Sequence, residues 1–310
     1  MKKLLSLALC LMMVLGMAGV VSAEADKPLI GILAPAVTHG WVAGVSYYAE
    51  EMAKELNLNY KIYTSNNADE MTTQLDDLMM LGAKSIVMFP QWEGMEVPVS
   101  AAVAEGVNIV NFDIAIDVDG VYRLAGDNYD MGVQGAHYIA EKLDGKGLIV
   151  ILDVPTSGSV AELRKAGFVD TIFEIAPDIE IIGTYATKFT REDGLKDMAD
   201  ILVKNPQIDA VYSLDDETSI GALQAIVEAG RTDIKVITGG GGCQEYFGMM
   251  PEYADIWLQS ATYHPSMVKE CVQMALDLAM GQAVEKVIII PTTIVDRENC
   301  ADFLDEHSPY

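Results

Sequence analysis

Residues 28–56, PLIGILAPAVTHGWVAGVSYYAEEMAKEL, decide the fold class of this chain. A short β-rich run at 29–33 leads through a loop into a second segment whose apolar residues recur three or four positions apart. These residues are Val42, Val45, Ala49, Met52 and Leu56. That spacing puts them on one face of a helix. The stretch therefore predicts a strand followed by an amphipathic helix, the unit from which parallel α/β sheets are built.

The 23 residues at the start of the chain have the pattern of a secretory signal. Lys2 and Lys3 precede an almost purely apolar run at 4–21, and Val21-Ser22-Ala23 predicts cleavage before Glu24. A membrane-spanning helix is the alternative, but no basic flank follows the run. Cys10 would suggest a lipoprotein, but Leu9 stands before it where a small residue is needed. We expect a soluble, exported protein in the periplasm.

Size and charge limit the remaining possibilities. Cleavage leaves 287 of the 310 residues, enough for one large domain or two α/β lobes, and loss of two lysines takes the net charge from −26 to −28. Such a surface repels nucleic acid and anionic lipid. No second apolar run of about 18 residues is present. The mature chain keeps three cysteines, Cys243, Cys271 and Cys300. Three cysteines allow at most one disulfide, and the sequence does not show which two would pair.

Strand-like and helix-like segments alternate along the whole chain, which indicates parallel sheets covered on both faces. The expected strands are 29–33, 60–64, 85–89, 108–112, 148–152, 179–185, 210–214, 235–238 and 256–259. Nine strands are many for one sheet, so we predict two doubly wound lobes joined by short crossovers, the first near 126–128. Ligands of such sheets bind beyond the carboxyl ends of the strands.

The residues at those strand ends, and the motifs around them, carry a family resemblance. The motifs are, in order, IGILAPAVTHGW, NNADEMTTQLDDLMMLGAKSIVMFP, VNIVNFD, AGDN, AELRKAGF, VYSLDDETSIGAL and LAMGQ. Over residues 28–297 the chain resembles the type I periplasmic sugar-binding proteins, the ribose- and galactose-binding group that serves ABC transporters. The resemblance implies two lobes joined by a three-crossover hinge, with a small ligand trapped between them. The implied bounds are 1–23 for the signal, 24–126 plus 263–292 for the N-terminal lobe, and 127–262 plus 293–310 for the C-terminal lobe.

The resemblance also implies ligand contacts, one position at a time. Thr38 stands where an Asn often binds hydroxyls, Trp41 where an aromatic ring stacks on the sugar, and Asp113 where a carboxylate accepts hydroxyl protons. The remaining matches are Arg164 for the arginine that holds ring oxygens, Phe189 for the second aromatic, and Asp215 in place of a common Asn. Three positions depart from the pattern: Ile114 replaces a common Arg, Phe89 a common Asn, and Gly240 a usual Asp.

The chemistry of these residue types suits a sugar, whose C–H face packs on a flat ring and whose hydroxyls bind charged partners. His39 and Trp92 are further candidates in the same loops. Each candidate also has a structural alternative. Trp41 would pack in the core, Asp113 would cap a turn and Arg164 would form a surface ion pair. Asp215 or Asp216, with Asp216 favoured, would cap the helix at 217–228.

Other chemistries lack their motifs. The sequence contains no HExxH motif and no paired histidines at the spacing of a metal site. The run Gly239–Gly242 fits neither phosphate-loop pattern. The run Ser157-Gly158-Ser159 is not a nucleophile elbow. We therefore expect no metal, no cofactor and no enzyme activity.

The prediction is a monomeric solute-binding protein that delivers a sugar or polyol to an ABC permease and its ATPase subunit. A ligand-sensing protein for a receptor, and an exported glycosidase using Asp113 and Asp215, are the alternatives. Ile114 and the missing Asp favour a deoxy or modified sugar, with a furanose signalling molecule or a flat heterocycle as other options.

Overall fold

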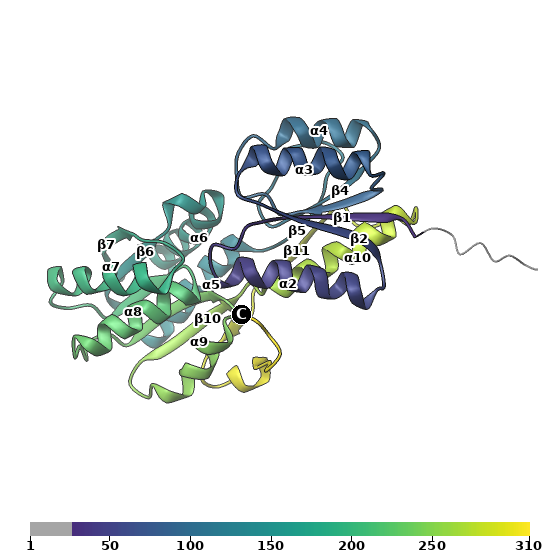
Figure 1. Cartoon of the computed structure of the whole chain (residues 1–310). Helices are drawn as coiled ribbons and strands as arrows, with labels where there is room; N and C mark the ends of the chain where they lie inside the picture. The colour runs from purple at the N-terminus through teal and green to yellow at the C-terminus, as the bar shows by residue number, and fades with distance from the viewer. Residues whose placement is uncertain (1–26) are drawn as a thin grey trace, which may run out of the picture.

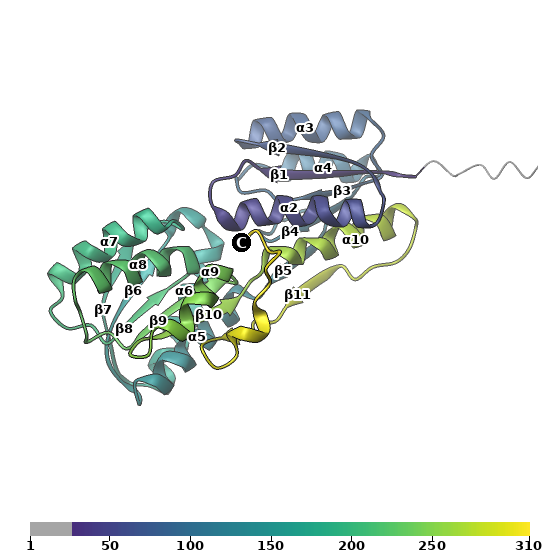
Figure 2. The same ribbon diagram turned by 60° about the horizontal axis from the view of Figure 1, so that its bottom comes forward.

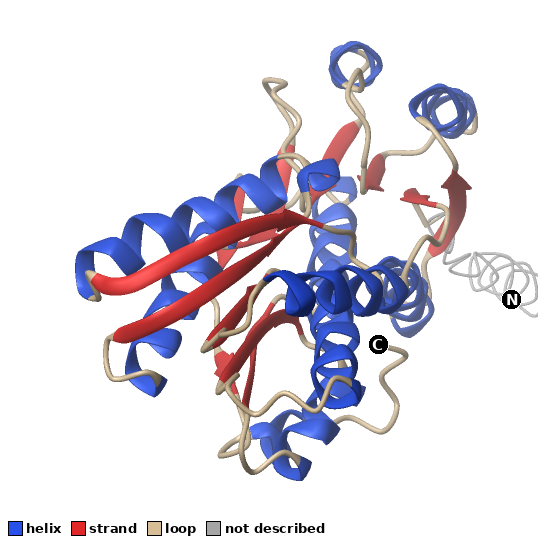
Figure 3. Ribbon diagram, turned by 90° about the vertical axis from the view of Figure 1, so that its left-hand side faces the viewer, coloured by secondary structure: helices blue, strands red, loops and turns tan. Residues whose placement is uncertain are grey.

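A computed structural model describes residues 27–310 of the chain. The expected signal segment 1–23, with Cys10 and the cleavage before Glu24, lies outside the described residues. The described residues form two α/β lobes, each built on a six-stranded sheet (Figure 1). Helices lie on either side of the strands (Figure 3). This arrangement confirms the predicted fold class.

The first lobe has the strand order β11-β5-β4-β3-β1-β2, and every neighbouring pair is parallel. Helices α2 and α10 pack on one face of the sheet, and α3 and α4 pack on the other (Figure 2). The strands are β1 Leu29–Pro35, β2 Asn59–Ser65, β3 Ser85–Met88, β4 Asn108–Phe112, β5 Tyr122–Gly126 and β11 Val287–Ile290. The helices are α2 Gly40–Glu55, α3 Ala68–Met80, α4 Glu96–Ala104 and α10 Val268–Ala279.

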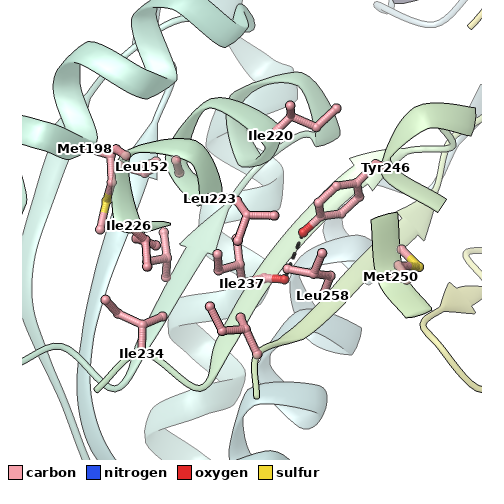
Figure 4. Packing of buried hydrophobic residues seen from close by; sticks show 14 of the residues in the cluster. Leu152, Met198, Ile220, Leu223, Ile226, Ile234, Ile237, Tyr246, Met250 and Leu258 are labelled. Atoms are coloured by element: carbon pink, nitrogen blue, oxygen red, sulfur yellow. Dashed lines mark hydrogen bonds between the residues drawn. The ribbon is translucent and has the colours of Figure 1, made fainter. Parts of the chain in front are cut away.

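The second lobe has the strand order β12-β10-β9-β8-β6-β7, with α5 and α6 on one face and α7, α8 and α9 on the other. Figure 4 shows the core beneath the second group of helices, where the Tyr246 hydroxyl donates to the Ile237 carbonyl at 3.1 Å. The strands are β6 Lys146–Asp153, β7 Asp178–Ala186, β8 Ala210–Ser213, β9 Val236–Gly241, β10 Trp257–Thr262 and β12 Ile294–Val295. The helices are α5 Asn128–Lys142, α6 Ser159–Ile175, α7 Arg191–Lys204, α8 Asp216–Glu228 and α9 Gln244–Met249.

Both sheets share the order 2-1-3-4-5-6 when strands are counted within each lobe, which is a doubly wound topology with its switch point beside the first strand. The nine predicted strands are all present, with bounds shifted by a few residues. Three strands were missed: β5, β11 and β12. β5 is short, and the charged Arg123 interrupts its apolar run. The two-residue β12 is antiparallel to β10, contrary to the expectation of purely parallel sheets.

The chain passes between the sheets three times, after β5, after β10 and between β11 and β12. The crossovers lie side by side. The Asp127 amide donates to the Ile290 carbonyl at 3.0 Å, and the Thr262 amide donates to the Thr293 carbonyl at 2.9 Å. The connections are therefore short and hydrogen-bonded to one another.

Two further observations concern the described residues. Cys243, Cys271 and Cys300 are all buried and free, so no disulfide links them. None of the helices between residues 27 and 310 combines the length and apolar character needed to cross a membrane.

Candidate ligand-binding cleft

A cleft of about 800 Å³ lies between the lobes and is lined by residues of both. Its wall on the first lobe comes from the segments that follow β1, β3 and β4. Its wall on the second lobe comes from the segments that follow β6, β7 and β8 and from the end of β9. These are the carboxyl ends of parallel strands, where doubly wound sheets bind ligands. The volume is typical of small-molecule sites.

Nine of the ten candidate residues line this cleft: Thr38, His39, Trp41, Trp92, Asp113, Arg164, Phe189, Asp215 and Gly240. Phe89 is the exception. It is only 2% exposed and packs edge-on against Trp41, with ring centroids 5.6 Å apart. Phe89 directly follows the fully buried strand β3, and its ring continues the core behind the cleft wall. The expectation that Phe89 lines the site is corrected accordingly.

Trp41 packs against the core and also lines the cleft. Its ring is stacked on Phe112, with centroids 5.9 Å apart and an interplanar angle of 8°. Its indole N–H donates to the Tyr263 carbonyl at 2.6 Å. The side chain is nevertheless only partly buried and lines the cleft. Trp41 is thus a rigid aromatic wall, held from behind by the core.

Asp113 is placed by an unusual backbone conformation. Its φ of 68° lies in the left-handed region, which residues other than glycine rarely adopt. The Arg123 side chain holds that backbone, because its Nε and Nη2 donate to the Asp113 carbonyl at 3.0 and 2.8 Å. The Asp113 carboxylate accepts a hydrogen bond from the Tyr263 hydroxyl. Burial raises the pKa of this carboxyl, and the Tyr263 hydroxyl and Arg164 oppose the shift.

Arg164 completes a polar chain that runs from one lobe to the other. Its Nε donates to Asn128 Oδ1 at 2.8 Å, and Asn128 Nδ2 donates to the Tyr263 hydroxyl at 3.3 Å. Arg164 Nη1 also donates to the Leu214 carbonyl at 2.8 Å, and the guanidinium lies 5.0 Å from the Tyr263 ring centroid. Two N–H groups of the guanidinium therefore donate to other residues of the protein. These bonds fix the orientation of the guanidinium plane at the cleft wall.

Asp215 caps helix α8, since its Oδ1 accepts from the Thr218 amide at 3.0 Å. Asp216 was favoured for that role, and this interpretation was wrong. The Asp216 carboxylate instead accepts from the amides of Gly242 and Cys243 at 2.8 and 2.9 Å. Burial raises the pKa of Asp215 to about 7 and that of Asp216 to about 6. The neighbouring Asp216 carboxylate raises the pKa of Asp215 further, because two negative charges repel each other.

His39 faces Phe189 across the cleft, with ring centroids 6.2 Å apart, so an aromatic group stands on each lobe. Its Nδ1 is buried and has no hydrogen-bond partner among residues 27–310. Burial lowers the pKa of His39 to about 4. The imidazole is therefore neutral at pH 7, and its Nδ1 is an unpaired polar atom in the cleft wall.

Several lining residues were missed or undervalued from the sequence. Tyr263 immediately follows β10 and so obeys the strand-end rule. Lys188, Thr190, Glu93 and Tyr310 were not named. For Tyr310 the sequence held no signal, because it belongs to no strand end and reaches the cleft from a separate segment. The aromatic residues Trp257 and Tyr185 do not line the cleft, and Trp257 packs beneath Arg297 and Lys142.

Comparison with known proteins agrees with this fold. The family model described as "Periplasmic binding protein domain" matches residues 30–283. The xylitol-binding protein of Mycolicibacterium smegmatis is 29% identical over 71% of this chain and 64% of its own length, which is slightly less than two thirds. The ribose import binding protein of Bacillus subtilis is 27% identical over 84% of this chain and 85% of its own length.

A solved structure shows the same fold. The solute-binding protein of an ABC transporter from Bacillus halodurans, with bound myo-inositol, superposes with a TM-score of 0.82 at 20% identity. The alignment covers 93% of this chain and all of that protein. With two lobes, three crossovers and a matching family model over most of its length, the chain belongs to the periplasmic binding protein domain family.

Proposed function

We propose that this protein is an exported solute-binding protein that captures a small sugar or polyol and delivers it to an ABC importer. The observation that carries the proposal is the inter-lobe cleft, in which aromatic walls and a buried carboxylate–guanidinium chain converge. Family membership and the sugar and polyol names of the relatives support it.

The cleft supplies the three kinds of contact that a sugar needs. Trp41 offers a flat face for C–H bonds, and Phe189 approaches from the other lobe. Asp113 has an acceptor oxygen beyond the one bound to Tyr263, and Arg164 is a fixed cationic donor. At two positions where the resemblance implies a charged residue, the cleft has the apolar side chain of Ile114 and, at Gly240, no side chain. This balance favours a ligand with fewer hydroxyls than a common pentose, such as a deoxy or modified sugar.

The mechanism follows from the position of the cleft. With lobe bounds at 24–126 plus 263–292 and 127–262 plus 293–310, the ligand contacts both lobes and stabilises their closed arrangement through its differential affinity. The closed monomer would dock on a permease, and a separate ATPase subunit would drive transport. No step alters the ligand, so the protein acts without catalysis, metal or cofactor.

Ligand identification tests the proposal. We expect the mature protein, purified without refolding, to release a small sugar or polyol that mass spectrometry identifies and that rebinds unchanged in calorimetry. Arg164→Ala, purified in parallel, should carry little of the same compound, whereas Lys196→Ala, at an exposed position on α7, should carry as much as the wild type. Conversion of the bound compound during incubation would instead indicate an enzyme.

A further inference from the structure

Residues 304–310 form a segment that joins the two lobes without being one of the crossovers. On the second lobe, the Asp305 amide donates to Gln244 Oε1 at 2.7 Å, and the Gln244 amide donates to the Tyr310 carbonyl at 3.0 Å. On the first lobe, the Tyr48 hydroxyl of α2 donates to Ser308 Oγ at 2.9 Å. Figures 1 and 2 both place this end of the chain beside the start of α2.

The segment delivers the side chain of Tyr310 into the cleft wall. A Cβ on Gly40, in the first turn of α2, would lie 3.2 Å from the Tyr310 ring. A Cβ on Gly241, at the end of β9, would lie 2.6 Å from the Tyr310 hydroxyl oxygen. A side chain at Gly40 would crowd the ring and one at Gly241 would displace its hydroxyl, so the two glycines leave the space that Tyr310 fills.

The Tyr310 hydroxyl is left without a partner in the protein. It forms no hydrogen bond with any of the described residues, although the ring is 6% exposed and lines the cleft. Burial holds the pKa of this phenol well above its ordinary value, so the group keeps its proton at neutral pH. Because Tyr310 lines the cleft, a ligand there can supply the hydrogen-bond partner that the described residues do not.

We infer that Tyr310 is a ligand-contacting residue, whose hydroxyl donates a hydrogen bond to a hydroxyl of the bound sugar or polyol. The inference rests on the proposed binding function. It places a neutral donor at the wall where Gly240 and Gly241 offer no side chain. Tyr310 thereby helps to determine which hydroxyl pattern the cleft accepts.

Tyr310→Phe tests the contact, because it removes the hydroxyl and keeps the ring between Gly40 and Gly241. Calorimetry with D-ribose, D-allose, xylitol and myo-inositol first identifies the tightest ligand of the wild type. For that ligand we expect Tyr310→Phe to raise the Kd about three- to tenfold, the worth of one hydrogen bond. The Tm of the ligand-free variant should stay at the wild-type value. Tyr47→Phe, at an exposed position on α2, is the matched control and should leave the Kd unchanged.

The outcomes separate this inference from the proposed function. A Tyr310→Phe variant that binds within twofold of the wild type, while Arg164→Ala loses binding, overturns the role of Tyr310 and leaves the binding function standing. A wild type that binds none of the four compounds and carries no co-purified sugar overturns the binding function, and the role of Tyr310 with it.

Discussion

The indole N–H of Trp41 donates a 2.6 Å hydrogen bond to the main-chain carbonyl of Tyr263, a residue 222 positions away in the chain. Trp41 stands on α2 of the first lobe, and Tyr263 stands in the crossover after β10. The orientation of the aromatic wall is thus set by a hinge segment. The same crossover residue binds Asp113 through its hydroxyl, so one tyrosine positions both the flat and the charged part of the cleft.

Substitution of Trp41 should therefore affect both affinity and stability. Trp41→Ala removes a cleft wall and a ring stacked on Phe112. We expect a loss of about 2–4 kcal/mol in binding, as for a buried aromatic anchor. The Tm without ligand should fall as well. Trp41→Leu should recover part of the stability but little of the affinity. Calorimetry and thermal melts on the same samples check this, and unchanged affinity per folded molecule would contradict stacking on the ligand.

Loss of the charged groups should weaken binding more than it weakens the fold. Asp113→Ala and Arg164→Ala should each cost about 2–5 kcal/mol of ligand affinity, because each leaves buried partners unpaired. Arg164→Lys should not restore the wild-type Kd, since an ammonium cannot reproduce the fork that binds Asn128 and Leu214. Circular dichroism should show a folded protein in each case. Wild-type affinity in both alanine variants would remove these residues from the site.

The architecture could be predicted from the sequence because the alternation of strands and helices is strong and local. Buried runs such as 85–88 and 210–213 are apolar throughout, and their periodicity is sufficient to identify them. β11 and β12 could not be found in this way, since they are short edge strands whose partners lie more than thirty residues away in the sequence. Their place in the sheets depends on tertiary pairing.

The site was predictable where it follows strand ends and unpredictable elsewhere. Asp113, Arg164 and Trp41 lie in or near loops that the topology brings together. The prediction for Phe89 was wrong because the side chain of a residue at a strand end can point either into the core or into the cleft. The sequence does not give that direction. Tyr310 was missed because its approach depends on the packing of residues 304–310 across both lobes.

Protonation of Asp215 should make stability depend on pH. In an unfolded chain this carboxyl titrates near pH 4, whereas burial and Asp216 raise the pKa in the fold to about 7. The folded state therefore holds a proton that the unfolded state has lost, and this contribution to stability is lost as pH rises from about 4 through 7. His39 acts in the opposite sense, but only as pH falls from about 6.5 toward 4.

Asp215→Asn isolates the effect, since Asn also caps helices well and does not ionise. We expect the Tm of the wild type to fall relative to that of Asp215→Asn as the pH is raised from 5 to 8, with most of the fall between pH 5 and 7 and little further change above that. Differential scanning fluorimetry across this range measures the difference. Parallel curves would show that the carboxyl is ionised throughout.

The start of the mature protein can be determined directly. Val21-Ser22-Ala23 predicts cleavage before Glu24, and Leu9 makes Cys10 unsuitable for lipid attachment. Protein expressed in a Gram-negative host should be found in the periplasmic fraction, with an intact mass that begins at Glu24. An exported form that begins with a lipid-modified cysteine would contradict this prediction.

The contact between α5 and α6 should control the position of Arg164. A Cβ on Gly132 of α5 would lie 2.1 Å from the Arg164 carbonyl, and one on Gly167 of α6 would lie 2.1 Å from the Tyr129 carbonyl. Both obstacles are backbone atoms, so they cannot move aside by a change of rotamer. Gly132→Ala or Gly167→Ala must therefore push the helices apart. This displaces Arg164 from Asn128, to which it is bonded at 2.8 Å.

We expect each of these variants to lose about 1–3 kcal/mol of stability from overpacking. Each should also bind the wild-type ligand more weakly, although neither glycine lines the cleft. Gly248→Ala in α9 is the matched control, because a Cβ there meets nothing within 4 Å and alanine favours the helix. The Tm of this control should equal or slightly exceed that of the wild type. Its Kd should equal the wild-type Kd. If Gly132→Ala melted and bound like the control, α6 would be free to shift without moving Arg164, and the close helix contact would have no part in shaping the cleft.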